Sequence, residues 1–296
     1  MGRNWARCPR SDKRGRGDLA QYLFVNLKRF DIPRALGGIN SQCPPARWGE
    51  ALVRQSRAAL AERPGVETVF FLPEAHLLPA VAAAAGPGPS VAVGCQGVYR
   101  KDVAPGGNFG AFTTFRTATA ARALGCSWAL IGHSEERADK MALTGDTGAV
   151  DALLRDEVRC ALAAGLKVLF CIGETAEEIP TREAVLRRQL RQGLPGVDRA
   201  PNIVLGYEPI WSIGPGKPVP TAAEVGRIAA LIKGIVRLPV VYGGGLKAEN
   251  AAAFGALPNL DGGLVGLTRF AGEIGFYPDE FAQIAAAYFA AKEEIL

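Results

Sequence analysis

The sequence predicts a single α/β domain that folds as a closed (β/α)8 barrel, and three observations support this fold class. Eight short runs of apolar, β-branched and aromatic residues occur at 22–27, 68–72, 91–95, 128–133, 167–173, 202–208, 239–245 and 262–267. Each run is continuously apolar, which is typical of parallel strands buried on both faces. Segments rich in Ala, Leu, Arg and Glu separate the runs, so strands alternate with helices.

The segments between the strands carry helix signals. Residues 46–63 and 221–237 have apolar residues at helical spacing. Thr221 precedes Glu224 by three positions, the spacing of a capping box, and Pro278 followed by two acidic residues suits the start of a last helix. An open doubly wound sheet is the alternative arrangement of these elements. No run is followed by a complete G-x-G-x-x-G turn, which favours the closed barrel.

Length and charge indicate one domain with a short extension. The chain has 296 residues, enough for one large α/β domain. The first 16 residues carry six Arg or Lys and one Asp, so we expect residues 1–19 to be a disordered basic extension and 20–296 to be the catalytic barrel. The net charge is +5, but no basic stripe with interleaved aromatic residues is present. This argues against a nucleic-acid partner.

Cysteine, histidine and hydropathy patterns indicate a cytoplasmic protein without metal or membrane contacts. The six cysteines form no C-x-x-C pair, which is typical of reduced thiols; they are Cys8, Cys43, Cys95, Cys126, Cys160 and Cys171. The two histidines, His76 and His133, have no metal-ligand spacing. The apolar runs are too short or too charged to span a bilayer, and the N-terminus has no apolar signal region.

Polar residues follow three of the predicted strands. Asn26 and Lys28 end the first strand, His133 to Glu135 end the fourth, and Glu208 ends the sixth. The seventh and eighth strands end instead in glycines, at 243–245 and 266. Because the carboxyl ends of barrel strands meet at one face, where barrel enzymes place their active sites, we expect these residues to lie together.

Each of these residues suits a chemical role. A partly buried Glu208 is a candidate general base, because desolvation favours its protonated form. His133 opens a helix, whose positive end keeps the imidazole neutral, so the ring can donate a hydrogen bond to a developing oxyanion. Lys28 can hold a phosphate or polarise a carbonyl, and glycine loops can cradle a phosphate. Taken singly, each feature also has an ordinary structural explanation as a cap, an ion pair, a solvated lysine or a tight turn.

The motifs together resemble those of the triosephosphate isomerase family. They run in family order as NLK (26–28), GAFT, LGCSW, IGHSE (131–135), CIGET, GYEPIWSIGPGK (206–217) and VYGGG (241–245). The resemblance implies a TIM barrel that isomerises triose phosphates in glycolysis and gluconeogenesis, with no cofactor and no metal. It implies that Glu208 is the base, that His133 shuttles protons at oxygen, and that Lys28 neutralises negative charge. Asn26 matches the asparagine beside the lysine, and Glu135 a glutamate that supports it.

The resemblance also assigns the phosphate end. The loop 212–217 would be a lid that closes over the substrate. The matching phosphate-binding positions are Lys28, Ser134, Gly214, Gly244, Gly245, Gly266 and Leu267. Several positions depart from the family pattern: Gly245 stands for a serine, Leu267 for a glycine, and the first strand carries Leu27, Arg29 and Phe30.

The resemblance implies a homodimer whose third-loop contact has been rebuilt. Thr113 matches the family threonine that touches the partner's asparagine. The family pairs a glutamate and an arginine across this contact, and Phe115 and Glu136 stand at those positions here. Both residues of the pair differ from the family pattern, so neither leaves a buried charge without a partner. Two alternatives to triose-phosphate isomerisation remain open: the same chemistry on a longer phosphorylated ketose or aldose, and a catalytically silent barrel that binds a phosphometabolite.

Overall fold

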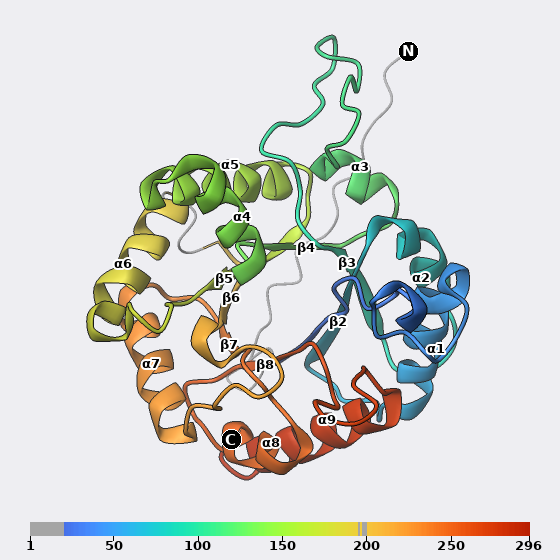
Figure 1. Cartoon of the computed structure of the whole chain (residues 1–296), viewed down its shortest axis with the longest axis vertical. Helices are drawn as coiled ribbons and strands as arrows, with labels where there is room; N and C mark the ends of the chain where they lie inside the picture. The colour runs from blue at the N-terminus through green and yellow to red at the C-terminus, as the bar shows by residue number, and fades with distance from the viewer. Residues whose placement is uncertain (1–20, 195, 197–199) are drawn as a thin grey trace, which may run out of the picture.

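The chain forms the predicted closed barrel. The computed structural model describes residues 21–194, 196 and 200–296, so the expected extension at 1–19 lies outside the described residues. Eight parallel strands close into a barrel in chain order (Figure 1). They are β1 (Gln21–Asn26), β2 (Val66–Leu72), β3 (Val91–Cys95), β4 (Trp128–Ile131), β5 (Lys167–Ile172), β6 (Ile203–Tyr207), β7 (Val240–Tyr242) and β8 (Gly262–Val265).

Helices surround the strands as an outer ring (Figure 1). They are α1 (Trp48–Ala59), α2 (Leu77–Ala84), α3 (Ala118–Ala123), α4 (Ser134–Thr144), α5 (Thr147–Ala163), α6 (Arg182–Gly193), α7 (Ala222–Ile235), α8 (Ala248–Gly255) and α9 (Pro278–Glu293). Short 3-10 turns occur at Arg34–Leu36, Pro45–Arg47, Glu74–His76, Ile179–Thr181 and Ile210–Ser212. Within the described ranges, none of the helices combines the length and apolarity needed to traverse a lipid bilayer.

The strands end where the chain must turn into the mouth of the barrel. The fourth predicted strand extends to residue 133, but β4 stops at Ile131, because Gly132 adopts a φ of 80° and leaves the ladder. The seventh predicted strand, 239–245, shortens to Val240–Tyr242. Its three following glycines form a loop instead. Apolarity alone does not separate such loop residues from the strand before them.

The predicted helix starts are present, with one change. Thr221 accepts a hydrogen bond from the backbone N–H of Glu224 at 3.2 Å, and Pro278 stands in the first turn of α9. The Glu224 side chain does not complete the capping box, because it pairs with Nη1 of Arg182 on α6 at 2.9 Å. A tertiary ion pair has therefore replaced the local contact.

The interior of the barrel is filled by side chains. Phe24 lies between Phe71 and Trp128, with ring centroids 5.8 and 5.0 Å away. These rings belong to an inner cluster made of Tyr22, Phe24, Val69, Phe71, Trp128, Leu130, Leu169, Cys171, Val204, Val241 and Leu264. A second, larger cluster fills the space between the strands and the helices. Since the centre is packed, a ligand must bind at an end of the barrel.

Candidate active site

A cavity of about 320 Å³ opens at the carboxyl ends of the strands. Every predicted site residue except Ser134 lines it: Asn26, Lys28, His133, Glu135, Glu208, Gly214, Gly244, Gly245, Gly266 and Leu267. Its other walls are Phe30, Ile213, Pro215, Gly243, Leu264 and Phe270. Ser134 lies just behind it, with its hydroxyl 3.4 Å from Nδ1 of His133. Residues far apart in the sequence therefore meet at one face, as the barrel topology requires.

His133 and Glu208 contact each other in this cavity. Nδ1 of His133 accepts a hydrogen bond from the backbone N–H of Glu135 at 3.4 Å, at the start of α4. This bond places the ring proton on Nε2, which donates to Oε1 of Glu208 at 3.2 Å. Both side chains are buried, and Oε2 of Glu208 has no partner among the described residues. The arrangement couples a neutral imidazole donor to a carboxylate with one free oxygen.

Lys28 is held in an unusual backbone conformation. Its φ is 42°, which non-glycine residues rarely adopt. Its backbone N–H donates to Oδ1 of Asn26 at 3.1 Å, and its ammonium contacts Oε1 of Glu135 at 2.6 Å. Burial alone would raise the pKa of Glu135, but the hydrogen bond and charge of Lys28 outweigh it, so this pKa lies below its usual value. The carboxylate of Glu135 therefore stays charged beside Lys28.

Gln96 supports the backbone around Asn26 and Lys28, although the sequence did not identify it as a site residue. Its side-chain amide nitrogen lies 3.1 Å from Oδ1 of Asn26, 3.1 Å from the carbonyl oxygen of Lys28 and 3.2 Å from that of Phe71. Gln96 follows β3 directly, so it satisfies the same rule that selected Asn26: a polar residue at the carboxyl end of a barrel strand. It ties the ends of β1 and β2 together and stabilises the strained Lys28.

Glu174 anchors the segment from Tyr207 to Trp211, which includes Glu208. It is fully buried after β5 and accepts hydrogen bonds from the hydroxyl of Tyr207 at 3.1 Å and from Nε1 of Trp211 at 2.9 Å. Nε of Arg182 donates to it at 2.7 Å. Burial and the charge of Glu174 raise the pKa of Tyr207, so its hydroxyl remains a donor. The sequence pattern contained Glu174 within CIGET but gave it no role of its own.

A glycine permits close approach at the same place. A Cβ at Gly173 would lie 1.8 Å from the carbonyl oxygen of Glu208, so only glycine fits between β5 and β6 here. The backbone N–H of Glu208 in turn donates to the carbonyl of Ile172 at 2.8 Å. These contacts fix the backbone of Glu208 at the end of β6, while its side chain reaches the cavity.

The phosphate end differs from the pattern typical of barrels. Gly245 has a φ of 95°, which favours glycine over the serine of the family pattern. A phosphate site of this fold is frequently completed by a short helix after the eighth strand. Here residues 266–277 form no helix, and Arg269 and Gly275 instead pair as an antiparallel bridge. The backbone N–H groups of Gly245 and Leu267 have no acceptor within the described chain, so they are free to bind an anion.

The third loop projects away from the barrel beside α3 (Figure 1). Phe115 is 53% exposed and stacks on Tyr99 of the same loop, with ring centroids 4.1 Å apart. Glu136 has partners in its own chain: the ammonium of Lys140 at 2.8 Å and the backbone N–H of Gly132 at 2.6 Å. Its negative charge is therefore satisfied without an arginine from another subunit.

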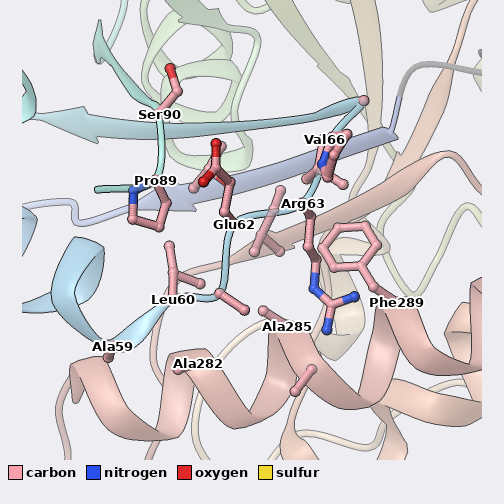
Figure 2. Close-up of a pocket in the computed structure, with 16 residues that line it drawn as sticks. Ala59, Leu60, Glu62, Arg63, Val66, Pro89, Ser90, Ala282, Ala285 and Phe289 are labelled. Carbon is pink, nitrogen blue, oxygen red and sulfur yellow. The ribbon is translucent and has the colours of Figure 1, made fainter. Parts of the chain in front are cut away.

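A second cavity of about 330 Å³ lies at the opposite, amino-terminal end of the strands (Figure 2). Figure 2 shows Arg63 beside Phe289 of α9, and the guanidinium of Arg63 pairs with Glu293 at 2.8 Å. Alanine and leucine side chains make up much of the remaining wall. The two cavities have similar volumes, so volume does not show which one is the active site. Lys28, His133 and Glu208 converge in the carboxyl-terminal cavity, which is therefore the candidate active site.

Metal ligands are not gathered at either cavity. Among residues 21–194, 196 and 200–296, no group of three or more His, Cys, Asp and Glu side chains is placed to hold a metal ion. The five described cysteines are free thiols, and Cys8 lies outside the described residues.

Comparison with known proteins agrees with the geometry of the site. The family model described as triosephosphate isomerase matches residues 46–287. The chain belongs to the triosephosphate isomerase family. The segment before residue 46, with Asn26 and Lys28, precedes the matched part, so these two residues rest on the barrel geometry and on the NLK motif.

Individual relatives carry the same family name. The triosephosphate isomerase of Bradyrhizobium sp. (strain ORS 278) is 35% identical over 223 residues, which cover 71% of this chain and 82% of that protein. The triosephosphate isomerase of Rhodopirellula baltica is 34% identical over 235 residues, covering 75% of this chain and 86% of that protein. The crystal structure of triosephosphate isomerase from Bartonella henselae superposes with a TM-score of 0.69 at 25% identity, covering 91% of this chain and 99% of that one. The family similarity thus extends over most of the barrel.

Proposed function

We propose that this member of the family interconverts dihydroxyacetone phosphate and D-glyceraldehyde 3-phosphate. The observation that carries the proposal is the contact of His133 Nε2 with Glu208 at 3.2 Å inside a cavity that Lys28 also lines. A base, a neutral hydrogen-bond donor and a cation are the groups that enediolate chemistry requires. The reaction moves protons within one molecule and changes no net oxidation state, so these residues supply all of its chemistry.

The proposed mechanism uses each residue in turn. Glu208 removes a proton from the carbon beside the carbonyl, and electron density moves to the carbonyl oxygen. The Nε2–H of His133, released from Glu208 by the substrate, donates to that oxygen, and Lys28 stabilises the negative charge. His133 delivers its proton to the former carbonyl oxygen and takes one from the neighbouring hydroxyl group, whose oxygen becomes the new carbonyl oxygen. Glu208 returns its proton to the former carbonyl carbon. Closure of the lid at 212–217 excludes water, which protects the phosphate-bearing enediolate from elimination.

Bulky side chains in the cavity wall favour a three-carbon substrate over a longer sugar phosphate. Leu267 and Phe270 both line the cavity, so bulky side chains occupy space at its phosphate end. A longer ketose or aldose would have to displace them. The intact set of Lys28, His133 and Glu208 also disfavours a silent binding protein, because binding alone does not need a paired base and donor.

A coupled assay with triose phosphates beside four- and five-carbon sugar phosphates tests the proposal. We expect turnover with triose phosphates and a loss of about 10²-fold or more in Glu208→Asp, because its carboxylate is withdrawn by one methylene. Glu294→Asp, at the exposed end of α9, is the matched control and should behave as wild type. Equal turnover by Glu208→Asp, or a preference for a longer sugar, would overturn the proposal.

We further propose that the chain forms a homodimer through its third loop. A groove of about 460 Å³ lies beside the active site and is lined by Asn26, Gln96 and Glu136 among others. The exposed Thr113 of a partner would enter this groove, and Phe115 would bury its exposed face in the same contact. Burial of a Phe contributes roughly 1.5–3 kcal/mol, more than an exposed ion pair at about 0–1 kcal/mol. The interface should therefore depend little on salt.

Sedimentation across a salt series tests this assembly. Phe115→Glu should loosen the dimer, because it replaces the exposed apolar face that the contact would bury with a carboxylate, which is costly to remove from water. Ile179→Glu, a comparably exposed apolar position near α6, is the control and should leave the dimer intact. A fully active monomeric wild type would contradict the proposal, as would a Phe115→Glu variant that dimerises equally well.

A further inference from the structure

The active-site cavity is poor in positive charge for a site that takes a dianionic phosphate. Its charged lining consists of Lys28, Glu135 and Glu208, so negative side chains outnumber positive ones. Lys28 is moreover already paired with Glu135 at 2.6 Å. The site also lacks a serine hydroxyl at Gly245 and a short helix after β8. Backbone N–H groups remain, but a further cation would offset the negative lining.

Lys247 is a cation without a carboxylate partner at this end of the cavity. It stands just before α8, two residues after Gly245, and its ammonium lies 4.3 Å from the ring centroid of Phe270. Phe270 is a wall of the active-site cavity. No Asp or Glu of the described chain forms an ion pair with Lys247, whereas nearby Arg29 and Arg269 are both paired with carboxylates. The charge of Lys247 is therefore available.

The local structure fixes Lys247 relative to the glycine loop. The backbone N–H of Lys247 donates to Oδ1 of Asn250 at 2.8 Å, and Nδ2 of Asn250 donates to the carbonyl of Gly245 at 3.0 Å. The amide side chain of Asn250 thus links the backbone of Lys247 to the glycine loop that lines the cavity. Lys217 forms no ion pair with a described carboxylate either, but it is exposed in the loop 212–217 and does not line the cavity.

We propose that Lys247 is a further phosphate-binding residue of this site. The inference rests on the proposed function, since it assumes a phosphorylated ligand. The face of Phe270 holds the ammonium by a cation–π contact in the free protein. When phosphate binds between the glycine loop and Leu267, the ammonium donates to a phosphate oxygen. Charge from Lys247 thereby takes the place of the hydroxyl and of the short helix that this phosphate end lacks.

The test compares Lys247→Met, Lys247→Arg and Arg227→Met. Methionine keeps the length and the contact with Phe270 but removes the charge; arginine keeps the charge. Arg227 is exposed on the outer face of α7 and forms no ion pair with the described residues, so its replacement removes the same charge elsewhere. Binding of inorganic phosphate is measured by calorimetry, and KM and kcat for triose phosphates are measured at several salt concentrations.

We expect Lys247→Met to weaken phosphate binding and raise KM about ten-fold, with kcat little changed, because one charge-assisted hydrogen bond is lost. Lys247→Arg should recover most of both, and Arg227→Met should match wild type. If Lys247 only packs against Phe270, methionine will bind phosphate as wild type does, and that result overturns the inference. An inactive wild type whose phosphate binding still depends on Lys247 would instead refute the proposed function and leave this inference standing.

Discussion

The buried carboxylate of Glu208, the proposed base, should lower the stability of the resting protein, and Glu208→Gln measures by how much. Glu208 is 4% exposed; His133 satisfies Oε1, but Oε2 has no partner among the described residues. An unsatisfied buried polar atom costs about 1–3 kcal/mol, and more when it is charged. Glutamine keeps an oxygen for His133 and replaces the unpaired carboxylate oxygen with an uncharged amide, which is less costly to bury. We expect the free energy of unfolding to rise by about 1–2 kcal/mol.

The same substitution should remove the activity. An amide accepts no proton from carbon, so the rate should fall by at least about 10²–10⁴-fold. Urea unfolding at equal protein concentration, read with the coupled isomerase assay, gives both quantities. Glu294→Gln, on the exposed end of α9, controls for the loss of one negative charge and should change neither. A Glu208→Gln variant that unfolds at lower urea than wild type would refute the argument about the unpaired oxygen.

Three further changes probe the rest of the site. Lys28→Ala should weaken inhibition by phosphoglycolate by about 10²-fold, because phosphate and enediolate lose their nearest cation; unchanged inhibition would contradict this. Gln96→Ala should cost about 1–3 kcal/mol in urea unfolding, since the Lys28 carbonyl oxygen loses its donor and the Asn26 and Phe71 oxygens each lose one of two; wild-type stability would show that Gln96 does not support the ends of these strands. Burial and the charge of Glu136 raise the pKa of Glu157 from 4.5 to about 9, so the folded chain holds a proton that the unfolded chain releases. Stability should therefore fall as pH rises from about 4.5 toward 9, and Glu157→Gln should flatten that slope; parallel pH profiles would rule this out.

The sequence was sufficient for the architecture because the strands are buried on both faces. A segment such as 167–173 is continuously apolar after Lys167, and β5 occupies Lys167–Ile172 almost as predicted. The chemistry-bearing positions could be predicted for a related reason. In a barrel the carboxyl ends of all strands share one face, so position along the chain already places Asn26, His133 and Glu208 together.

Side-chain partners could not be predicted in the same way, because they depend on neighbours brought together by folding. The Glu224 carboxylate does not form the predicted capping box and pairs instead with Arg182, 42 positions away. Glu136 was expected to mark a rebuilt contact between subunits, and it has partners within its own chain in Lys140 and Gly132. Gln96, like Asn26, directly follows a barrel strand, but the sequence alone did not identify it. Its role depends on hydrogen bonds to oxygens of Asn26, Lys28 and Phe71, which only the folded chain brings within reach.

Two departures from ordinary folding rules lie at the carboxyl-terminal mouth of the barrel. Lys28 has a φ of 42°, and Glu208 buries an oxygen without a partner among the described residues. Neither feature helps the fold, and each is held by contacts that do: Gln96 bonds the backbone of Lys28, and the close approach of Gly173 fixes that of Glu208. Strain that the surroundings maintain in this way is the physical mark of a site selected for chemistry.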